Sequence, residues 1–404
     1  MFSTITKNDK NLQGTVTLPP SKSISNRLLI IKAISGKDFE IKNCSGSTDT
    51  IALQAALQTQ SKIFDAGDAG TTYRFLTAYL CLTEGDKILT GTERMKQRPI
   101  GQLVNALKEL GAHIEFTENE NYPPLLIHGG TLKGGEISID ASVSSQFIST
   151  LLLIAPVLKE GLTLHLKGTK VSEPYIDMTL KLMAEFSIQF EKSYHTIIIK
   201  PQEYKVKDIE VEVDWSSAAF FYQMVALADN NCEIVLKGLK KNSIQGDKII
   251  ADLMYYFRVH TRYTDDGVIL SKGKEHIPKL RFNFSFYPDL VPSILVTCAV
   301  TGVKADIWGI EHLRLKETDR IAALQTELAK TGVRFYKQED IFVCEGKMRP
   351  AHYLVNTYND HRIAMAFAPL ALQFGRIDIE NTNVITKSFP QFWDELKSIG
   401  FEIK

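Results

Sequence analysis

The feature of this sequence that most limits its fold is a pattern that recurs along the whole chain. Each copy has an amphipathic helix, a small or turn residue, a short alternating strand, a polar turn and a second strand. The copies cover residues 50–64 in a weaker form, 103–128, 178–200, 249–270, 321–344 and, truncated, 392–404. Their helix-to-strand junctions lie roughly 70 residues apart, a spacing too long for a solenoid and typical of a repeated supersecondary unit.

Six such copies predict an α/β protein of two halves, each with three units and with helices packed inside mixed sheets. A chain of 404 residues with 44% apolar side chains is also too long for one ordinary core. We expect the halves to meet near Val213 and Asp214. Because the sequence has no low-complexity segment or Pro-rich linker, a short crossing is expected there rather than a flexible tether.

Composition excludes several classes of protein. Lys plus Arg number 47 and Asp plus Glu number 47, so the net charge gives no general attraction to nucleic acids or anionic membranes. No apolar stretch reaches the roughly 18 residues of a membrane span, and residues 1–20 lack the apolar run of a secretory signal. The five cysteines are far apart and lack CxxC spacing, so we expect buried small side chains in a cytoplasmic protein.

Side chains suited to anion binding lie where helices are predicted to begin. In PPSKSISNR (19–27), Lys22 and Ser23 fall at a helix start, where free N–H groups and the helix dipole favour an anion, and Arg27 follows one turn later. An ordinary capped helix with solvated cations is the alternative interpretation. No GxxxxGK[ST] motif is present, which disfavours a Walker-type kinase.

Further motifs in the first half have the same character. DAGDAGTTYR (65–74) is a loop of small residues whose glycines allow a ligand to approach the backbone, and MKQRPI (95–100) places two cations before a helix. SVSSQF (142–147) has more short polar side chains than helix capping needs, which suits a polyhydroxylated ligand. SEPY (172–175) adds two hydroxyls, although each motif is also compatible with a plain helix start.

The second half repeats this arrangement with more charge. YPD (287–289), HLRLKETDR (312–320) and YNDHR (358–362) precede apolar helices, and Lys387 follows a strand in TKSFP. Cations therefore stand beside helix starts or loops in both halves, at Lys22, Arg27, Arg74, Arg98, Lys316, Arg320, Arg362 and Lys387. If those helix starts face one another, they form a cationic cleft for two phosphorylated or carboxylated small molecules, with Asp289 and Glu317 available for proton transfer.

Taken in order, PSKSISNR, DAGTTYRF, MKQRPI, SSQF, SEPYIDMTL, LKETDR, YNDHR and TKSFP resemble the EPSP synthase family of enolpyruvyl transferases over essentially the whole chain. The resemblance implies a two-lobed inside-out α/β barrel with three βαβαββ-type units in each lobe. It places the lobe that binds shikimate 3-phosphate at residues 21–213, the second lobe at 1–20 plus 214–404, and a hinge near 20 and 213.

The resemblance also implies a reaction. An enzyme of this family transfers the enolpyruvyl group of phosphoenolpyruvate to the 5-hydroxyl of shikimate 3-phosphate and releases phosphate, in the shikimate pathway of aromatic amino acid biosynthesis. It implies a cytoplasmic monomer that needs no metal or organic cofactor and has no nucleic-acid or membrane partner.

Carried over motif by motif, the resemblance assigns residues to both substrates. Shikimate 3-phosphate is assigned to Lys22, Ser23, Arg27, Ser144, Ser145, Gln146, Ser172, Tyr175, Asp289, His312 and Lys316. Phosphoenolpyruvate is assigned to Lys22, Gly70, Arg98, Gln146, Arg320, Arg362 and Lys387. We hypothesise that Asp289 accepts the proton of the attacking hydroxyl, Glu317 helps protonate the methylene carbon, and Lys22 stabilises developing charge. Acid and base must act together because an alcohol and an enol phosphate are both unreactive in water.

Three positions depart from the family pattern. Asp68 stands where members often have Asn or Ser, so it either points away, pairs with a cation or weakens phosphoenolpyruvate binding. His312 stands where some members have Asn, which affects its assignment as a substrate contact. Trp215 stands where many have a small residue, which could alter packing at the hinge.

Three other functions are less consistent with the sequence. The sister transferase that acts on UDP-N-acetylglucosamine usually carries a reactive cysteine in the loop corresponding to residues 93–98, and no cysteine occurs there. A non-catalytic anion-binding homologue would have no need for Lys22, Asp289 and Glu317 together. RNA phosphate cyclisation on a related repeat fold is disfavoured by the neutral charge and by the absence of a nucleotide motif.

Overall fold

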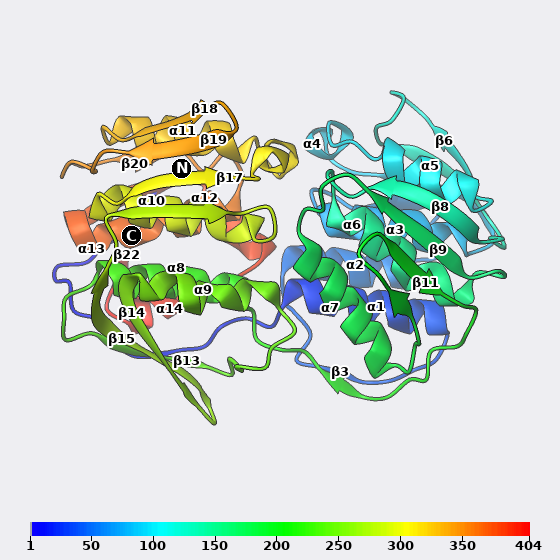
Figure 1. Ribbon diagram of the computed structural model, residues 1–404, viewed down its shortest axis with the longest axis horizontal. Coiled ribbons are helices and arrows are strands. Elements are labelled where there is room, and N and C mark those ends of the chain that lie inside the picture. Colours follow the sequence, from blue (N-terminus) through cyan, green and yellow to red (C-terminus); the bar gives the residue numbers. More distant parts are fainter. Residues whose placement is uncertain (1) are drawn as a thin grey trace. The chain divides into compact units, whose positions relative to one another are not determined.

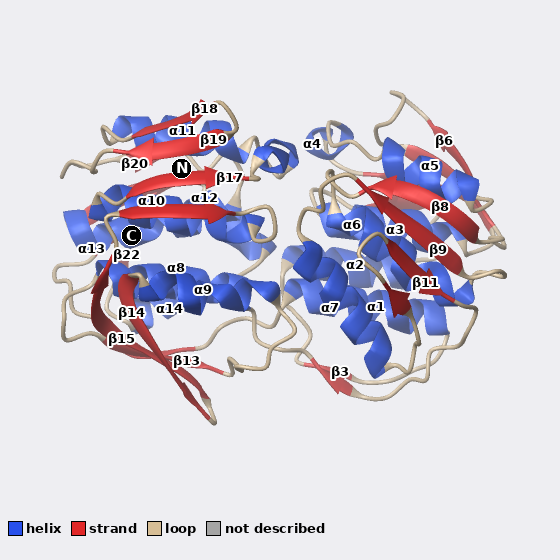
Figure 2. Ribbon diagram, in the orientation of Figure 1, coloured by secondary structure: helices blue, strands red, loops and turns tan. Residues whose placement is uncertain are grey.

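The computed structural model describes residues 2–404 and divides the chain into two compact units. Unit 2 is the continuous segment Pro20–Val211, and unit 1 combines Met1–Pro19 with Glu212–Lys404. Each unit contains three sheets, and within each unit Figures 1 and 2 show strands lying outside a group of helices. The prediction of an α/β protein built from repeated units with inner helices is confirmed.

The elements of unit 2 follow one another in this order, with η marking a 3₁₀ helix: α1 (Lys22–Ser35), β3 (Ile41–Lys42), α2 (Thr48–Gln58), β4 (Ile63–Asp65), α3 (Gly70–Cys81), β5 (Gly85–Thr90), α4 (Glu93–Lys96), α5 (Gly101–Glu109), β6 (His113–Phe116), β7 (Leu125–Gly129), β8 (Gly135–Asp140), α6 (Ser145–Ile154), η1 (Ala155–Val157), β9 (Leu162–Lys167), α7 (Glu173–Glu185), β10 (Glu191–Lys192), β11 (Thr196–Ile199) and β12 (Ile209–Glu210).

The elements of unit 1 are β1 (Phe2–Thr6), β2 (Gln13–Val16), α8 (Trp215–Leu227), β13 (Glu233–Lys237), η2 (Gly246–Ile249), α9 (Ile250–Tyr255), β14 (Phe257–Thr264), β15 (Gly267–His276), β16 (Lys279–Asn283), η3 (Pro288–Leu290), α10 (Val291–Thr301), β17 (Lys304–Trp308), η4 (Glu311–Leu315), α11 (Arg320–Lys330), β18 (Arg334–Gln338), β19 (Ile341–Glu345), β20 (Leu354–Val355), α12 (His361–Phe367), η5 (Ala368–Leu370), α13 (Ala371–Phe374), β21 (Arg376–Glu380), η6 (Thr382–Lys387), α14 (Phe392–Ser398) and β22 (Glu402–Ile403).

Five of the six sheets share one topology. Their strand orders are β4-β5-β7-β6, β8-β9-β11-β10, β2-β13-β15-β14, β16-β17-β19-β18 and β20-β21-β1-β22. In each sheet the first two strands are parallel, and the other two neighbouring pairs are antiparallel. Repetition of this order in five places shows that the sequence periodicity reflects a repeated structural unit.

The two irregular copies have simple structural explanations. The sixth sheet contains only β12 and β3, because the chain passes from α2 directly to β4 and forms no hairpin in this copy. The last copy is complete although the chain ends at β22, because β1 supplies its missing strand. Ile5 of β1 pairs with both Ile377 and Ile403.

The central helices are buried on all sides. Every residue of α8 and α12 is buried, as are ten residues of α10. Figure 1 shows these three helices between the sheet of β16–β19 and the sheet of β13–β15. A charged group in the middle of such a helix would lose its hydration, so charged motifs at helix starts are the natural place for a site.

Two predictions from composition can be compared with the structure. Four cysteines are buried as expected, but Cys44 is half-buried because it lies between β3 and α2. No helix within residues 2–404 combines the length and the apolar character needed to cross a bilayer.

Candidate active site

Most predicted site residues lie at or just before the N-terminal ends of helices. In unit 2 these helices are α1, α3, α6 and α7, which contact one another. In unit 1 the corresponding elements are η3 with α10, η4 with α11, and α12. Free backbone N–H groups at such ends give each site a local preference for negative charge.

Lys22 and Arg27 of α1 have different environments. Lys22 Nζ forms an ion pair with Asp49 Oδ2 at 2.8 Å, and Asp49 is buried in α2. Arg27 is 2% exposed and uses four of its five N–H donors within the protein, on Thr179 Oγ1, Ser149 Oγ and the carbonyls of Ser23 and Tyr175. Burial lowers the pKa of Arg27 to about 10, so it remains charged at neutral pH. Its main visible role is therefore to hold α1, α6 and α7 together.

Arg98 lies against the backbone of Gly70. A Cβ atom on Gly70 would lie 2.8 Å from Cζ and Nη2 of Arg98, so a larger residue here would displace the guanidinium from this position. Arg98 is 6% exposed, and its Nε has no hydrogen-bond partner among the described residues. Arg74 fixes the surrounding loop by donating to the carbonyls of Gly70 and Pro99, each at 3.3 Å. A buried guanidinium with unused donor capacity beside a helix start is a strong feature of an anion site.

The serine-rich segment before α6 also has donor capacity. Ser144 is the N-cap and accepts the backbone N–H of Gln146 at 3.3 Å, while Ser145 is buried. Gln146 Nε2 donates to Thr71 Oγ1 at 2.9 Å and so links α6 to α3. Capping uses one hydroxyl of this segment, as the sequence suggested, and the others are not needed for it.

Ser172 and Tyr175 lie on either side of the start of α7. Ser172 has φ of 54° and ψ of 35°, and its side chain makes no capping bond. The backbone N–H of Tyr175 donates to the Ser172 carbonyl at 3.0 Å. Arg27 donates to the Tyr175 carbonyl at 3.3 Å, which connects this turn to α1.

The structure shows the contacts of Asp68 and Trp215, two of the residues that depart from the family pattern. Asp68 is exposed and accepts a hydrogen bond from Thr92 Oγ1, so it joins the loop before α3 to the turn before α4. Trp215 is 1% exposed at the start of α8 and packs near Tyr222 and Tyr263, with ring centroids 6.4 and 6.5 Å away. Trp215 is therefore a core residue of unit 1.

Unit 1 contains a buried cluster of opposite charges centred on Arg320. This guanidinium is 1% exposed and donates to Asp360 Oδ2 at 2.9 Å, to Glu317 Oε2 at 2.8 Å and to Asp289 Oδ1 at 3.5 Å. Burial alone would lower the pKa of Arg320, but the charges of Asp360, Glu317 and Asp289 raise it above its ordinary value. Arg320 therefore stays charged and holds the two predicted proton-transfer carboxylates in one cluster.

Asp289 is the second centre of this cluster. It accepts from Arg362 Nη2 at 2.6 Å, and its carbonyl accepts from Arg362 Nη1 at 3.3 Å. Burial alone would raise the pKa of Asp289, but the charges of Arg362, Lys316 and Arg320 hold it well below its usual range. Asp289 is thus ionised near neutral pH, in the state required of a proton acceptor.

The remaining predicted residues of unit 1 border this cluster. His312 and Lys316 belong to the turn before α11, and burial followed by the charge of Lys316 lowers the pKa of His312 to about 3. His312 is therefore neutral at physiological pH. Lys387 ends η6, which packs against α12, the helix that carries Arg362 in its first turn.

The structure adds residues that were not assigned from the sequence. Asp49, Thr71 and Asp360 each bind a predicted site residue, and Asp360 also caps α12 by accepting the N–H of Arg362 at 2.9 Å. Asp247 is buried and accepts from Ser216 Oγ at 2.6 Å, and burial followed by the charge of Asp289 raises its pKa. Asp360 stands inside the YNDHR motif and Thr71 inside DAGDAGTTYR, whereas Asp49 and Asp247 have no local sequence signal.

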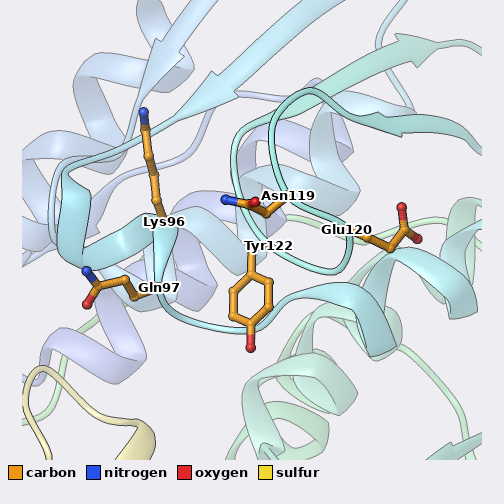
Figure 3. Close-up of a pocket in the computed structure, with 5 residues that line it drawn as sticks. All are labelled: Lys96, Gln97, Asn119, Glu120 and Tyr122. Carbon is orange, nitrogen blue, oxygen red and sulfur yellow. The ribbon is translucent and has the colours of Figure 1, made fainter.

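A separate surface pocket of about 530 Å³ lies in unit 2. It is lined by Lys96, Gln97, Asn119, Glu120 and Tyr122, whose side chains point in different directions in Figure 3. Gln97 adjoins Arg98 in sequence, but no predicted site residue lines this pocket. No group of three or more His, Cys, Asp or Glu side chains within residues 2–404 is placed to hold a metal ion.

Comparison with known proteins gives a consistent result. A family profile described as EPSP synthase (3-phosphoshikimate 1-carboxyvinyltransferase) matches residues 6–60 and 51–396. A 3-phosphoshikimate 1-carboxyvinyltransferase of Bacteroides fragilis is 45% identical over 397 residues, covering 97% of each chain. The Aliivibrio salmonicida protein of the same name is 36% identical and covers 96% of this chain and 97% of its own. A solved EPSP synthase from Acinetobacter baumannii shares the fold, with a TM-score of 0.78, 23% identity and complete coverage of both chains.

Proposed function

The chain belongs to the EPSP synthase (3-phosphoshikimate 1-carboxyvinyltransferase) family, and from that premise we propose how the site residues of its two units divide the reaction. It is an enzyme that transfers the enolpyruvyl group of phosphoenolpyruvate to shikimate 3-phosphate, in the shikimate pathway of aromatic amino acid biosynthesis. Each substrate carries a phosphate and a carboxylate. Fixed cations are therefore needed to bring the two anions together.

We assign shikimate 3-phosphate chiefly to unit 2. The proposed ligands are Lys22, Ser23, Arg27, Ser144, Ser145, Gln146, Ser172 and Tyr175, joined by Asp289, His312 and Lys316 of unit 1. Hydroxyls and amides in this set suit a polyhydroxylated ring, and Lys22 suits an anionic group. Arg27 has one N–H donor beyond its four internal bonds, so we assign it mainly to fixing the turn at Tyr175.

Phosphoenolpyruvate is assigned to cations from both units. The proposed ligands are Lys22, Gly70, Arg98, Gln146, Arg320, Arg362 and Lys387. Arg98 supports this assignment because it is buried against Gly70 and its Nε has no partner among the described residues. Arg320 and Arg362 are held in fixed positions by carboxylates, which reduces the entropy lost when they bind an anion.

Proton transfer is assigned to the carboxylates of unit 1. Asp289 accepts the proton of the 5-hydroxyl as its oxygen attacks C2 of phosphoenolpyruvate, and Glu317 helps to protonate the methylene carbon. The resulting tetrahedral adduct then loses a proton from its new methyl group as the C2–O bond to phosphate breaks, which releases phosphate and forms the enol ether. Cations lower the pKa of Asp289 in the free protein, so anionic substrates that neutralise Arg362 and Lys316 should make it a stronger base in the loaded site.

The observation that carries this proposal is the buried cluster in which Arg320 contacts Asp289, Glu317 and Asp360. In this cluster the cation that we assign to phosphoenolpyruvate contacts both carboxylates that we assign to proton transfer. The test is to mix the purified protein with shikimate 3-phosphate and phosphoenolpyruvate and to measure phosphate release. Release is expected with this pair and not with UDP-N-acetylglucosamine as acceptor, and the opposite pattern would reverse the assignment.

We also propose that the enzyme acts as a cytoplasmic monomer and that the chain crossings near residues 20 and 213 are hinges between lobes 21–213 and 1–20 plus 214–404. Closure is expected because substrate anions would reduce repulsion among the binding cations. Small-angle scattering should show one chain per particle and a smaller radius of gyration when both substrates or their analogues are present. A dimer would contradict the proposed monomer, and an unchanged radius of gyration would contradict the proposed closure.

A further inference from the structure

The turn that carries Ser172 adopts an uncommon backbone conformation. Ser172 has φ of 54° and ψ of 35°, in the left-handed region that side chains with a Cβ atom disfavour. The residue is 4% exposed, and its hydroxyl makes no capping bond with α7. Because the local sequence contributes neither a glycine nor a side-chain cap, surrounding groups must stabilise this conformation.

An ion pair spans the turn. Lys170 Nζ contacts Glu173 Oε1 at 2.6 Å, so the pair connects the residues on either side of Ser172. Its side chains are only 5% and 21% exposed. Burial alone would raise the pKa of Glu173, but the hydrogen bond from Lys170 and the charges of Lys170 and Lys192 lower it. Glu173 is therefore ionised, and the pair is screened from solvent more than a surface ion pair.

The hairpin of the same structural unit covers this pair. Lys192 of β10 contacts Glu173 at 3.4 Å and also binds Asp177. The ring of Tyr194, in the turn between β10 and β11, has its centroid 4.0 Å from Lys170 Nζ. Tyr194 is itself 72% exposed, so its ring covers Lys170 at the protein surface and does not belong to the hydrophobic core. A cation over an aromatic face is attracted to it, which favours the observed position of Lys170.

We propose that Lys170 and Glu173 are positioning residues for shikimate 3-phosphate binding. Their ion pair, covered by Tyr194, holds the left-handed turn that presents the Ser172 hydroxyl to the substrate. The inference rests on the proposed function, in which Ser172 binds this substrate. The cluster of Lys170, Lys192, Glu173 and Asp177 has no net charge, so its contribution is the orientation of Ser172 and adds little electrostatic attraction for the anion.

The first test is steady-state kinetics of Lys170→Met, which keeps an extended side chain and removes the charge. We expect the KM for shikimate 3-phosphate to rise by about 10-fold, because a hydrogen bond to an ionised ligand is lost, while the KM for phosphoenolpyruvate and kcat stay within about twofold. Lys170→Arg should recover most of the affinity. The matched control is Lys207→Met, which removes an exposed ion pair with Glu185 at the other end of α7 and should change no kinetic constant.

A double-mutant cycle separates positioning from general damage. In a Ser172→Ala background the hydroxyl is absent, so Lys170→Met should raise the KM for shikimate 3-phosphate by less than about twofold. The proposal would be overturned by an equal rise in the KM for shikimate 3-phosphate in both backgrounds. A folded Lys170→Met enzyme with an unchanged KM for this substrate would also overturn it. If Lys170→Met does not fold, Glu173→Gln supplies the same comparison with a smaller change of shape. Absence of phosphate release by the wild-type enzyme would instead refute the proposed function.

Discussion

Replacing Gly70 with alanine should selectively weaken phosphoenolpyruvate binding. The new Cβ atom would lie 2.8 Å from both Cζ and Nη2 of Arg98 and would also overlap Nη1. Because favourable contacts between such atoms begin at about 3.5 Å, the guanidinium must withdraw by about 1 Å. Arg98 is 6% exposed, so it has little room to keep its present orientation. Loss of one charge-assisted hydrogen bond costs about 1.5–3 kcal/mol, which corresponds to about a 10- to 100-fold higher KM.

The assay is phosphate release at varied phosphoenolpyruvate with saturating shikimate 3-phosphate, and then the reverse. Gly70→Ala should raise the first KM and leave the second within about twofold. Gly46→Ala is the matched control, because a Cβ there meets no atom within 4 Å and its φ is not in the left-handed region. A folded Gly70→Ala enzyme with an unchanged KM for phosphoenolpyruvate would refute the assignment of Arg98 to that substrate.

Three further changes test other parts of the molecule. Asp289→Asn should bind both substrates but lose about 100-fold in kcat, because it cannot accept the hydroxyl proton, and near-normal turnover would remove Asp289 from the mechanism. In the unfolded state His312 becomes protonated below about pH 6.5, whereas in the folded state it stays neutral until about pH 3. The unfolding free energy should therefore fall as pH drops through this window. His312→Gln should flatten that slope in urea titrations at pH 7, 6 and 5, and an unchanged slope would contradict its neutral state. Trp215→Ala should lower the unfolding free energy by about 3–5 kcal/mol, and a loss below about 1 kcal/mol in chemical denaturation would contradict its role in the core.

The repeated units could be predicted because their signals are local. Apolar periodicity and turn residues lie within each helix–hairpin segment, and they located α5 with β6 and β7 and α11 with β18 and β19. The strand partners of β1 could not be predicted in this way. They lie 370 or more residues away in the sequence, and no local pattern records such a pairing.

The candidate site shows the same difference between residues with a local sequence signal and residues brought in from distant segments. Lys22, Arg98, Arg320 and Arg362 were identified because each stands in a motif at or before a helix start. Their carboxylate and glycine neighbours come from other segments, as with Asp49 beside Lys22 and Gly70 beside Arg98. The near-complete burial of Arg320 also depends on packing that spacing alone does not specify. Lys387 was expected after a strand and lies at the end of the 3₁₀ helix that follows β21.

The order of synthesis gives the two units different folding histories. Unit 2 is one continuous stretch, so it can fold while the ribosome is still making the rest of the chain. Strand β1 is made long before β21 and β22, and neither of its edges is paired until they follow. During that interval its unpaired backbone groups are open to pairing with other chains, so we expect residues 2–6 to be prone to intermolecular strand pairing until β21 and β22 have been made.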